Sequence, residues 1–409
     1  MSNNGNAIVA QSGGPTAVIN NSVCGVVETW LKSASGKIYG GISGIKGILA
    51  GDIIDLEQQE KSIIAGLRYT PGAGIFSCRH KVSQADQERL VDIFKKLDIR
   101  YFFYNGGNDS MDTAHKTYQA AQAAGWDLQV IGIPKTIDND LPFTDHSPGY
   151  GSAAKYIAAT VRETGIDLES VYTKNKVTVL EAMGRDAGWL TAAGALSKRW
   201  DDEAPHLIYL PETPFYTERF LGDVEQVYKK LGYCYVVVSE GIADEQGNYL
   251  SASETQDAFG HAQLSGAGMV LKNVVERELG IKARCNTLGT TQRAAAHFAS
   301  RVDAEEAYMV GSAAVQYALS GKTGVMVTIE RRGNDPYSSA AGEVALEKVA
   351  NIERKFPMEW INEARNYVMP EFTRYALPLL SGEVSVPMKD GLPDYVRLDT
   401  SRGRVNLEE

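Results

Sequence analysis

Residues 101–110 read YFFYNGGNDS, and an amphipathic segment follows them from residue 111 to residue 124. The aromatic run predicts a β-strand, and the periodic segment predicts an α-helix. Glycines at such a junction let backbone N–H groups approach an anion, and the helix adds the positive end of its dipole. The Asp109 carboxylate would repel phosphate there unless a cation lies between them, or unless the repulsion itself selects the ligand.

Outward from this junction, short β-rich runs alternate with longer helical patterns. The alternation predicts an α/β protein with mostly parallel sheets and crossover helices on both faces. The expected strands cover residues 7–11, 101–104, 128–133, 177–181, 207–210, 233–239 and 325–329. The expected helices cover residues 17–31, 110–124, 151–165, 189–196, 220–231, 266–278, 303–319 and 340–352, with Asp303 and Glu306 as a capping pair. The proline-rich tail from Met369 is expected to pack as extended chain.

Length and composition limit the classes of function. A chain of 409 residues suggests roughly two or three domains, and no apolar run approaches the about 20 residues that cross a bilayer. The first six residues lack the features of a signal peptide, so a cytoplasmic location and no membrane partner are expected. A net charge of −10 argues against binding to nucleic acid, and any phosphate site must therefore be a local cluster of cations. The six histidines show no zinc-binding spacing, which favours magnesium held by oxygen.

Four further segments carry polar residues directly after expected strands. Residues 12–16 (SGGPT) lack the spacing of a dinucleotide site or a P-loop, and alone they are typical of a plain tight turn. Residues 134–140 (PKTIDND) combine a lysine with two aspartates, which suits either phosphoryl transfer or a solvated polar turn. Residues 181–185 (EAMGR) and 239–241 (SEG) place a cation and a carboxylate at one sheet edge, although each alone is typical of a surface ion pair.

Taken together and in order, these motifs resemble the phosphofructokinase A family, and within it the pyrophosphate-dependent 6-phosphofructokinases. The resemblance extends over about residues 7–330 and includes the segment 288–293 (LGTTQR). It implies two Rossmann-like, three-layer α/β/α domains with mostly parallel sheets and an active site in the cleft between them. It assigns residues 1–149 and about 288–340 to a pyrophosphate-binding domain, and residues 150–287 and about 341–409 to a sugar-phosphate-binding domain with the tail. It also implies a homodimer or homotetramer.

The activity that the resemblance implies is reversible phosphoryl transfer from pyrophosphate to the 1-hydroxyl of fructose 6-phosphate, with Mg²⁺. Asp138 is the implied general base, with Thr136 and Asp140 beside it. The implied donor-binding residues are Gly13, Gly14, Arg79, Asp109, Ser110 and Lys135, and the implied metal-binding residues are Asn108 and Asp109. The implied substrate-binding residues are Thr136, Ile137, Asp138, Met183, Gly184, Arg185, Glu240, Thr290 and Arg293, with Lys176 and Arg284 reaching in from a neighbouring subunit.

Two positions bear on the choice of donor. ATP-using members of the family usually have glycine where this chain has Asp109 and Lys135. The carboxylate would repel the α-phosphate of a nucleotide, while the ammonium offsets the extra terminal charge of pyrophosphate.

Asn108 stands where the family commonly has aspartate, and Thr290 stands where it usually has histidine or tyrosine. An ATP-dependent kinase, a kinase preferring sedoheptulose 7-phosphate and a non-catalytic regulatory subunit remain alternatives.

Overall fold

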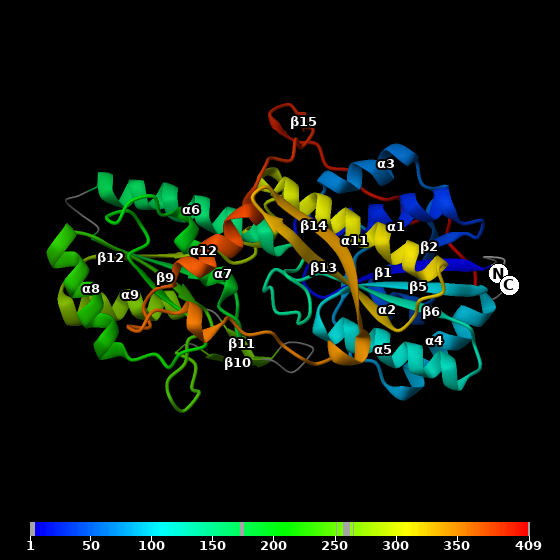
Figure 1. The fold of residues 1–409 in the computed structure, drawn as a ribbon, viewed down its shortest axis with the longest axis horizontal. Helices are drawn as coiled ribbons and strands as arrows, with labels where there is room; N and C mark the ends of the chain where they lie inside the picture. Colours follow the sequence, from blue (N-terminus) through cyan, green and yellow to red (C-terminus); the bar gives the residue numbers. More distant parts are fainter. Residues whose placement is uncertain (1–4, 172–175, 251, 257–261, 265, 408–409) are drawn as a thin grey trace. The chain divides into compact units, whose positions relative to one another are not determined.

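The computed structural model describes residues 5–171, 176–250, 252–256, 262–264 and 266–407, which form two compact units (Figure 1). Unit 1 comprises Met1–Ser152, Arg293–Glu353 and Gly382–Glu409. Unit 2 comprises Ala153–Gln292 and Arg354–Ser381. Residues 1–4, which belong to the amino-terminal segment considered above, lie outside the described residues.

Unit 1 contains an eight-stranded sheet with the order β14-β13-β6-β5-β1-β2-β3, and β4 pairs with β1. The pairs β13–β6, β6–β5, β5–β1, β1–β2 and β1–β4 are parallel. The two edge strands pair antiparallel, β3 with β2 and β14 with β13. The strands are β1 (Asn6–Ser12), β2 (Ile38–Gly41), β3 (Ile53–Asp55), β4 (Ser77–Cys78), β5 (Ile99–Gly106), β6 (Gln129–Pro134), β13 (Val325–Asn334) and β14 (Tyr337–Ala345). A separate antiparallel pair is formed by β15 (Met388–Lys389) and β16 (Leu392–Pro393).

Helices cover both faces of this sheet (Figure 1). They are α1 (Ile19–Ser33), α2 (Gly44–Ala50), α3 (Lys61–Gly66), α4 (Gln84–Lys96), α5 (Asn108–Ala123) and α11 (Arg301–Leu319). Alternate residues of β1 enter two different cores. Ala7 and Val9 join the core formed with α1 and α11, and Ile8 and Ala10 join the core formed with α2, α4 and α5. A strand buried on both faces must be apolar throughout, which explains the continuous apolar run in β1.

Unit 2 contains a parallel four-stranded sheet with the order β12-β7-β9-β8. Its strands are β7 (Val177–Ala182), β8 (Leu207–Tyr209), β9 (Cys234–Ser239) and β12 (Ala283–Thr287), and β10 (Ala252–Gln256) pairs with β11 (Ala262–Leu264) separately. The helices that lie in unit 2 or continue into it are α6 (Tyr150–Ser170), α7 (Trp189–Ala192), α8 (Thr217–Leu231), α9 (Ala267–Leu279), α10 (Thr291–Ala294) and α12 (Pro370–Ala376). Val179 and Val236 pack on one face with apolar residues of α8 and α9. These sheets confirm the predicted α/β class.

The helix predicted over residues 340–352 is wrong. Residues up to Ala345 belong to β14, which pairs antiparallel with β13 over nearly its whole length. Pairing with a strand that already belongs to the sheet outweighs the intrinsic helix preference of this alanine-rich segment. Only a single 3₁₀ turn follows, at Leu346–Lys348.

The cap of α11 also differs from the prediction. The N-cap is Ser300, whose hydroxyl accepts a hydrogen bond from the Asp303 N–H at 3.4 Å. The Asp303 carboxylate instead accepts hydrogen bonds from the N–H groups of Gly149 and Ser152, at 2.8 and 2.9 Å. The predicted capping pair therefore joins α11 to the loop before α6.

The carboxyl-terminal tail is not wholly extended and divides between the two units. It begins with the helix α12 in unit 2, whereas residues 382 onward belong to unit 1. There the Val405 N–H donates to the Ile53 carbonyl, and the Asp55 N–H donates to the Gly403 carbonyl. Residues 341–353 also belong to unit 1 rather than to the unit with which the prediction grouped them. The binding role of each predicted domain stays a prediction.

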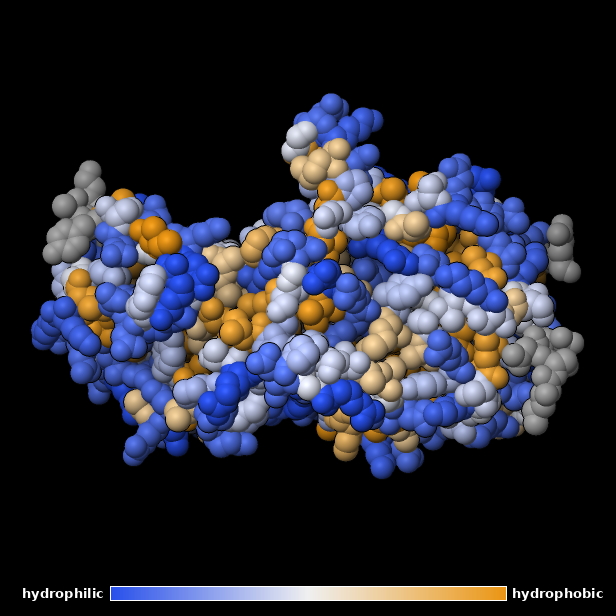
Figure 2. Space-filling view, turned by 45° about the horizontal axis from the view of Figure 1, so that its top comes forward, coloured by the Kyte–Doolittle hydropathy of each residue, from blue (hydrophilic) through white to orange (hydrophobic). Residues whose placement is uncertain are grey.

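The surface is mainly hydrophilic on the face in Figure 2, where hydrophobic residues form smaller patches. Large exposed apolar side chains such as Trp200 and Leu392, which are 62% and 71% exposed, lie far apart in the sequence. Single apolar side chains on a surface are ordinary in folded proteins. Among the described helices, none has the length and apolar character needed to span a bilayer.

A buried ionic network joins the loop before α6 to α11 and β13 in unit 1. His146 is 1% exposed, and its two ring nitrogens face carboxylate oxygens of Asp145 at 2.8 Å and Glu306 at 2.6 Å. Arg331 also binds Asp145, at 2.8 Å. Because carboxylates only accept hydrogen bonds, both ring nitrogens must carry protons. Burial opposes this charge, yet Glu306 and Asp145 together raise the pKa of His146 to about 9.

This network predicts a pH dependence of stability. A histidine whose pKa rises on folding stabilises the protein fully below its unfolded pKa, and that contribution is lost as the pH rises through about 9. We expect urea denaturation to show that wild-type loses about 1–3 kcal/mol more stability than His146→Gln between pH 6 and pH 9.5. His297→Gln, which changes an exposed histidine, should keep the wild-type dependence. Parallel pH profiles for wild-type and His146→Gln would contradict this assignment.

Candidate functional site

The loops after β1, β5 and β6 lie together at one edge of the unit 1 sheet. Parallel pairing sets Gln11 opposite Asn105 and Gly106 opposite Pro134, so the residues that follow these strands emerge side by side. In open α/β sheets, ligands bind beyond the carboxyl ends of the strands. The structure thus brings together the predicted residues of segments 12–16, 106–110 and 134–140.

A diglycine turn follows β1. Gly13 has a φ of +77°, which favours glycine, and its N–H donates to the Cys78 carbonyl at 3.0 Å. A Cβ atom added to Gly14 would lie 2.7 Å from a guanidinium nitrogen of Arg293 and 3.9 Å from one of Arg79. The missing side chain therefore leaves room for two arginines beside the turn.

Lys135 is the third cation at this turn. Its side chain is buried, and its Nζ donates a hydrogen bond to the Gly14 carbonyl at 2.8 Å. Burial lowers the pKa of Lys135 to about 8, although the carboxylates of Asp138 and Asp140 oppose this effect. Burial and the neighbouring Arg79 likewise lower the pKa of Arg293. Three cations in so small a region suit a ligand with several negative charges.

The first turn of α5 borders the same region. Asn108 Nδ2 donates to Asp140 Oδ2 at 3.3 Å, while Asp109 is exposed and Ser110 is buried. Asn108 Oδ1 and Asp140 Oδ1 are both buried without a hydrogen-bond partner. Burial and the charge of Glu353 raise the pKa of Asp140.

These two oxygens provide a test for the predicted magnesium site. A hard cation prefers oxygen ligands, so two buried oxygens without partners, on side chains that bond each other, fit Mg²⁺. Within the described residues there is no group of three or more His, Cys, Asp or Glu side chains that could hold a metal. Most of the coordination would therefore come from the bound phosphates and water. Asp140, predicted only as a catalytic neighbour, is a better candidate ligand by this criterion than the exposed Asp109.

The loop after β6 has a locally determined shape. The Thr136 hydroxyl accepts a hydrogen bond from the Asp138 N–H at 3.1 Å. Asn139 has a φ of +55°, a conformation that asparagine tolerates, and its Oδ1 accepts from the Ser147 N–H at 3.0 Å. Ile137 is buried. These contacts hold Asp138, which is only partly buried, between two fixed neighbours.

In unit 2, the predicted substrate residues follow β7 and β9, at the carboxyl edge of the sheet. Gly184 has a φ of +114°, and its carbonyl accepts from the Ser239 hydroxyl at 2.7 Å. The Glu240 N–H donates to the Ala182 carbonyl at 3.0 Å. The Met183 N–H donates to Gln292 Oε1 at 3.3 Å. The structure therefore brings Met183, Gly184 and Glu240 together.

Glu240 and Arg185 are suited to a polar ligand. Burial and the nearby Glu181 raise the pKa of Glu240 to about 7, and Arg185 opposes this shift. The Arg185 Nε is buried without a hydrogen-bond partner. A carboxylate with a raised pKa and a guanidinium nitrogen without a partner can together bind hydroxyl and phosphate groups.

Two predicted substrate residues of unit 2 lie away from this group within one chain. Arg284 lies on β12 opposite Thr178, and Lys176 immediately precedes β7, so both lie toward the amino ends of the strands. Thr290 is exposed in the loop after β12. The predicted action of Lys176 and Arg284 in a neighbouring subunit stays a prediction.

Sequence reasoning missed two residues that support the site. Gln292 holds the Met183 backbone, and the signal was its position inside the recognised segment 288–293. Glu353 acts electrostatically on Asp140 from a distant part of unit 1. No local pattern around Glu353 indicates that role.

The fold and the site together define the class of protein, which is an α/β phosphotransferase with a cation-lined turn. The phosphofructokinase family model matches residues 6–318, and the chain belongs to the phosphofructokinase family. It is 44% identical to the pyrophosphate--fructose 6-phosphate 1-phosphotransferase of Halomonas elongata, with 99% of this chain and 98% of that protein covered. It is 35% identical to a sulfofructose kinase of Alkalicoccus urumqiensis, with 88% and 92% covered.

A solved structure is also similar over the whole chain. The pyrophosphate-dependent phosphofructokinase of Marinobacter aquaeolei superposes with a TM-score of 0.90 at 44% sequence identity. The match covers 98% of this chain and 97% of that structure. The fold of the family therefore extends over both units.

We predict that a substitution in the loop after β9 lowers the stability of the protein. A Cβ atom at Gly241 would overlap the backbone oxygen of Arg185, which cannot move as a flexible side chain would. We expect Gly241→Ala to lower the free energy of unfolding by about 1–3 kcal/mol in chemical denaturation. Gly222 in α8 has open space at its Cβ position, so Gly222→Ala should be neutral or slightly stabilising. Equal stability of both variants would show that this close approach is not required.

Proposed function

We propose that the protein transfers a phosphoryl group reversibly from pyrophosphate to the 1-hydroxyl of fructose 6-phosphate, giving fructose 1,6-bisphosphate and phosphate. The observation that carries this proposal is the position of Lys135, whose buried ammonium bonds Gly14 beside Arg79 and Arg293, in the same loop as Asp138. The name of the full-length relative from Halomonas elongata supports the same donor and acceptor.

Unit 1 would bind the donor. Lys135, Arg79 and Arg293 would neutralise the charges of pyrophosphate, and the backbone N–H of Gly14 would donate to it. Asp109, exposed in the first turn of α5, would repel the additional phosphate of a nucleotide. Asn108 and Asp140 would hold Mg²⁺, which would balance the charge of the transferred phosphoryl group.

Asp138 would act as the general base. Its carboxylate would accept the proton of the sugar 1-hydroxyl as that oxygen forms a bond to the terminal phosphorus. The bond between this phosphorus and the bridging oxygen breaks, and phosphate leaves with the electron pair. Thr136 and Asn139 would keep Asp138 in place through the contacts of its loop.

Unit 2 would bind the sugar phosphate. Glu240 would accept hydrogen bonds from sugar hydroxyls, and Arg185 would bind an anionic oxygen through a guanidinium with a free buried nitrogen. Lys176 and Arg284 would complete the phosphate site of a second copy in a homodimer or homotetramer. The meeting of the two residue sets in one active site stays a prediction.

Replacing the base tests this mechanism. Asp138→Asn keeps the size of the side chain but cannot accept the proton, so we expect kcat to fall about 10²–10⁴-fold while the fold is retained. The matched control is Asp127→Asn, which changes an exposed aspartate just before β6 rather than after it. Steady-state rates with pyrophosphate and circular dichroism of both variants provide the measurement. Turnover of Asp138→Asn near the wild-type value would rule out the base assignment.

A double variant tests the choice of donor. Asp109→Gly combined with Lys135→Gly removes both charges, and we expect kcat/KM for pyrophosphate to fall about 10–100-fold with some turnover appearing with ATP. The control is Asp112→Ala with Lys116→Ala, which removes an ion pair further along the same helix. An unchanged ratio of pyrophosphate to ATP turnover in the first variant would refute the donor argument.

A second candidate differs only in the acceptor. The 35% identical relative named sulfofructose kinase, together with the exposed Thr290, favours a wider range of sugar acceptors. A matrix of rates separates the candidates: pyrophosphate or ATP against fructose 6-phosphate, sedoheptulose 7-phosphate or sulfofructose, with and without Mg²⁺. The proposal requires the highest rate with pyrophosphate and fructose 6-phosphate. No turnover with any pair would favour a non-catalytic regulatory subunit instead.

A further inference from the structure

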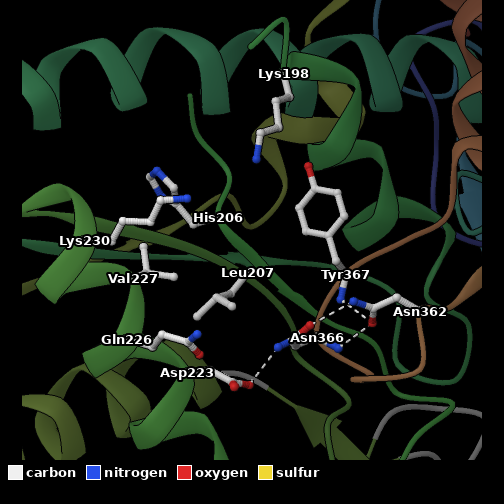
Figure 3. A pocket seen from close by; sticks show the side chains of 10 residues that line it. All are labelled: Lys198, His206, Leu207, Asp223, Gln226, Val227, Lys230, Asn362, Asn366 and Tyr367. Atoms are coloured by element: carbon white, nitrogen blue, oxygen red, sulfur yellow. Dashed lines mark hydrogen bonds between the residues drawn. The ribbon is translucent and has the colours of Figure 1, made fainter. Parts of the chain in front are cut away.

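Unit 2 contains a pocket of about 450 Å³ at the start of β8 (Figure 3). It lies between α8 and the segment around Tyr367. His206 and Leu207 line it at the amino end of β8, whereas Met183 and Glu240 follow the carboxyl ends of the parallel strands β7 and β9. The pocket is therefore at the opposite edge of the sheet from the candidate substrate residues.

One side of the pocket carries positive charge. Figure 3 shows the ammonium groups of Lys198 and Lys230 on the same side as the Tyr367 hydroxyl. Neither lysine forms an ion pair within the described part of the chain, and Lys198 bonds only the Pro205 carbonyl, at a long 3.4 Å, besides lying 5.2 Å from the Tyr367 ring. Burial lowers the pKa of Lys198, and the charges of Asp201, Asp202 and Glu203 oppose this shift. Two ammonium groups that line one cavity and form no ion pair within the described residues favour an anionic ligand.

His206 does not add to this charge. Its Nδ1 accepts a hydrogen bond from the Tyr235 N–H at 2.8 Å, and its Nε2 lies 3.2 Å from the Asp202 carbonyl. Burial lowers the pKa of His206 to about 4, so the ring is neutral at physiological pH. The neutral imidazole therefore lines the pocket, and these two contacts hold it in place.

The other side of the pocket offers hydrogen-bond acceptors. Asp223 Oδ2 accepts from the Tyr209 hydroxyl at 2.8 Å and from Asn366 Nδ2 at 2.9 Å. Both contacts involve the same carboxylate oxygen, so the second oxygen can accept from a ligand hydroxyl. The Gln226 amide also lines this side. Leu207, Val227 and the Tyr367 ring add apolar surface, which suits the carbon chain of a polar ligand.

We propose that this pocket binds a small phosphorylated polyol, with its phosphate between Lys198 and Lys230 and its hydroxyl groups toward Asp223. The volume falls within the range of small-molecule sites and fits a compound of this size. Two cations and one carboxylate match a dianionic phosphate that is joined to hydroxyl donors.

Calorimetric titration of the purified full chain with glycerol 3-phosphate tests the proposal, with three proteins compared. We expect wild-type and Lys229→Met to share a binding component that is at least about tenfold weaker in Lys198→Met/Lys230→Met. Lys229 is the matched control because it lies on the same helix and pairs with Glu225. Any phosphate binding at the candidate active site is common to all three proteins, so the difference isolates the pocket.

Two results would overturn the proposal. One is equal affinity of wild-type and the double variant for glycerol 3-phosphate. The other is equal affinity of wild-type for inorganic phosphate and glycerol 3-phosphate, because the Asp223 side would then contribute nothing. The single variant Lys230→Met, which changes an exposed side chain, keeps the test available if the double variant does not fold. The measurement is of binding, so its result is independent of the proposed phosphoryl transfer.

Discussion

The hydrogen bond from the buried ammonium of Lys135 to the Gly14 carbonyl is the contact on which the unit 1 site depends. It joins the loops after β1 and β6, and it places a positive charge where burial alone would disfavour one. The carboxylates of Asp138 and Asp140 offset part of that cost, so the cation and the two acidic residues stabilise one another's positions. A polyanionic ligand would complete the balance of charge, which supports the proposal that this region binds phosphate.

The loop that carries Asp138 is also held from a distance. Asp303 on α11 accepts hydrogen bonds from the N–H groups of Gly149 and Ser152, and Glu306 binds the buried His146. Helix α11 thus anchors the far end of the loop, while Asn139 fixes its near end. Polar groups buried in this way are costly unless all their partners are present, which explains why the network connects several elements.

Each edge of the unit 2 sheet carries polar groups that the chain itself does not fully bond. At the carboxyl edge, Glu240 and Arg185 keep bonding capacity that the chain itself does not use. At the amino edge, Lys198 and Lys230 line a pocket and form no ion pair in the part of the chain that the structure describes. Both sets of groups are incompletely satisfied by the protein, and this is the physical basis for assigning a ligand to each.

The sequence by itself determined the α/β class and the main strand-to-helix junctions, because apolar strands followed by glycine turns are local signals. The residues of the candidate site came from the resemblance to a family, and their roles stay a prediction. Tertiary structure decided the rest. Residues 337–345 form a strand because β13 is available to pair with them. Ser300 caps α11 because the Asp303 carboxylate accepts hydrogen bonds from Gly149 and Ser152 instead. Glu353 reached Asp140 only through folding. Such contacts depend on distances between remote segments, and no local pattern in the chain encodes them.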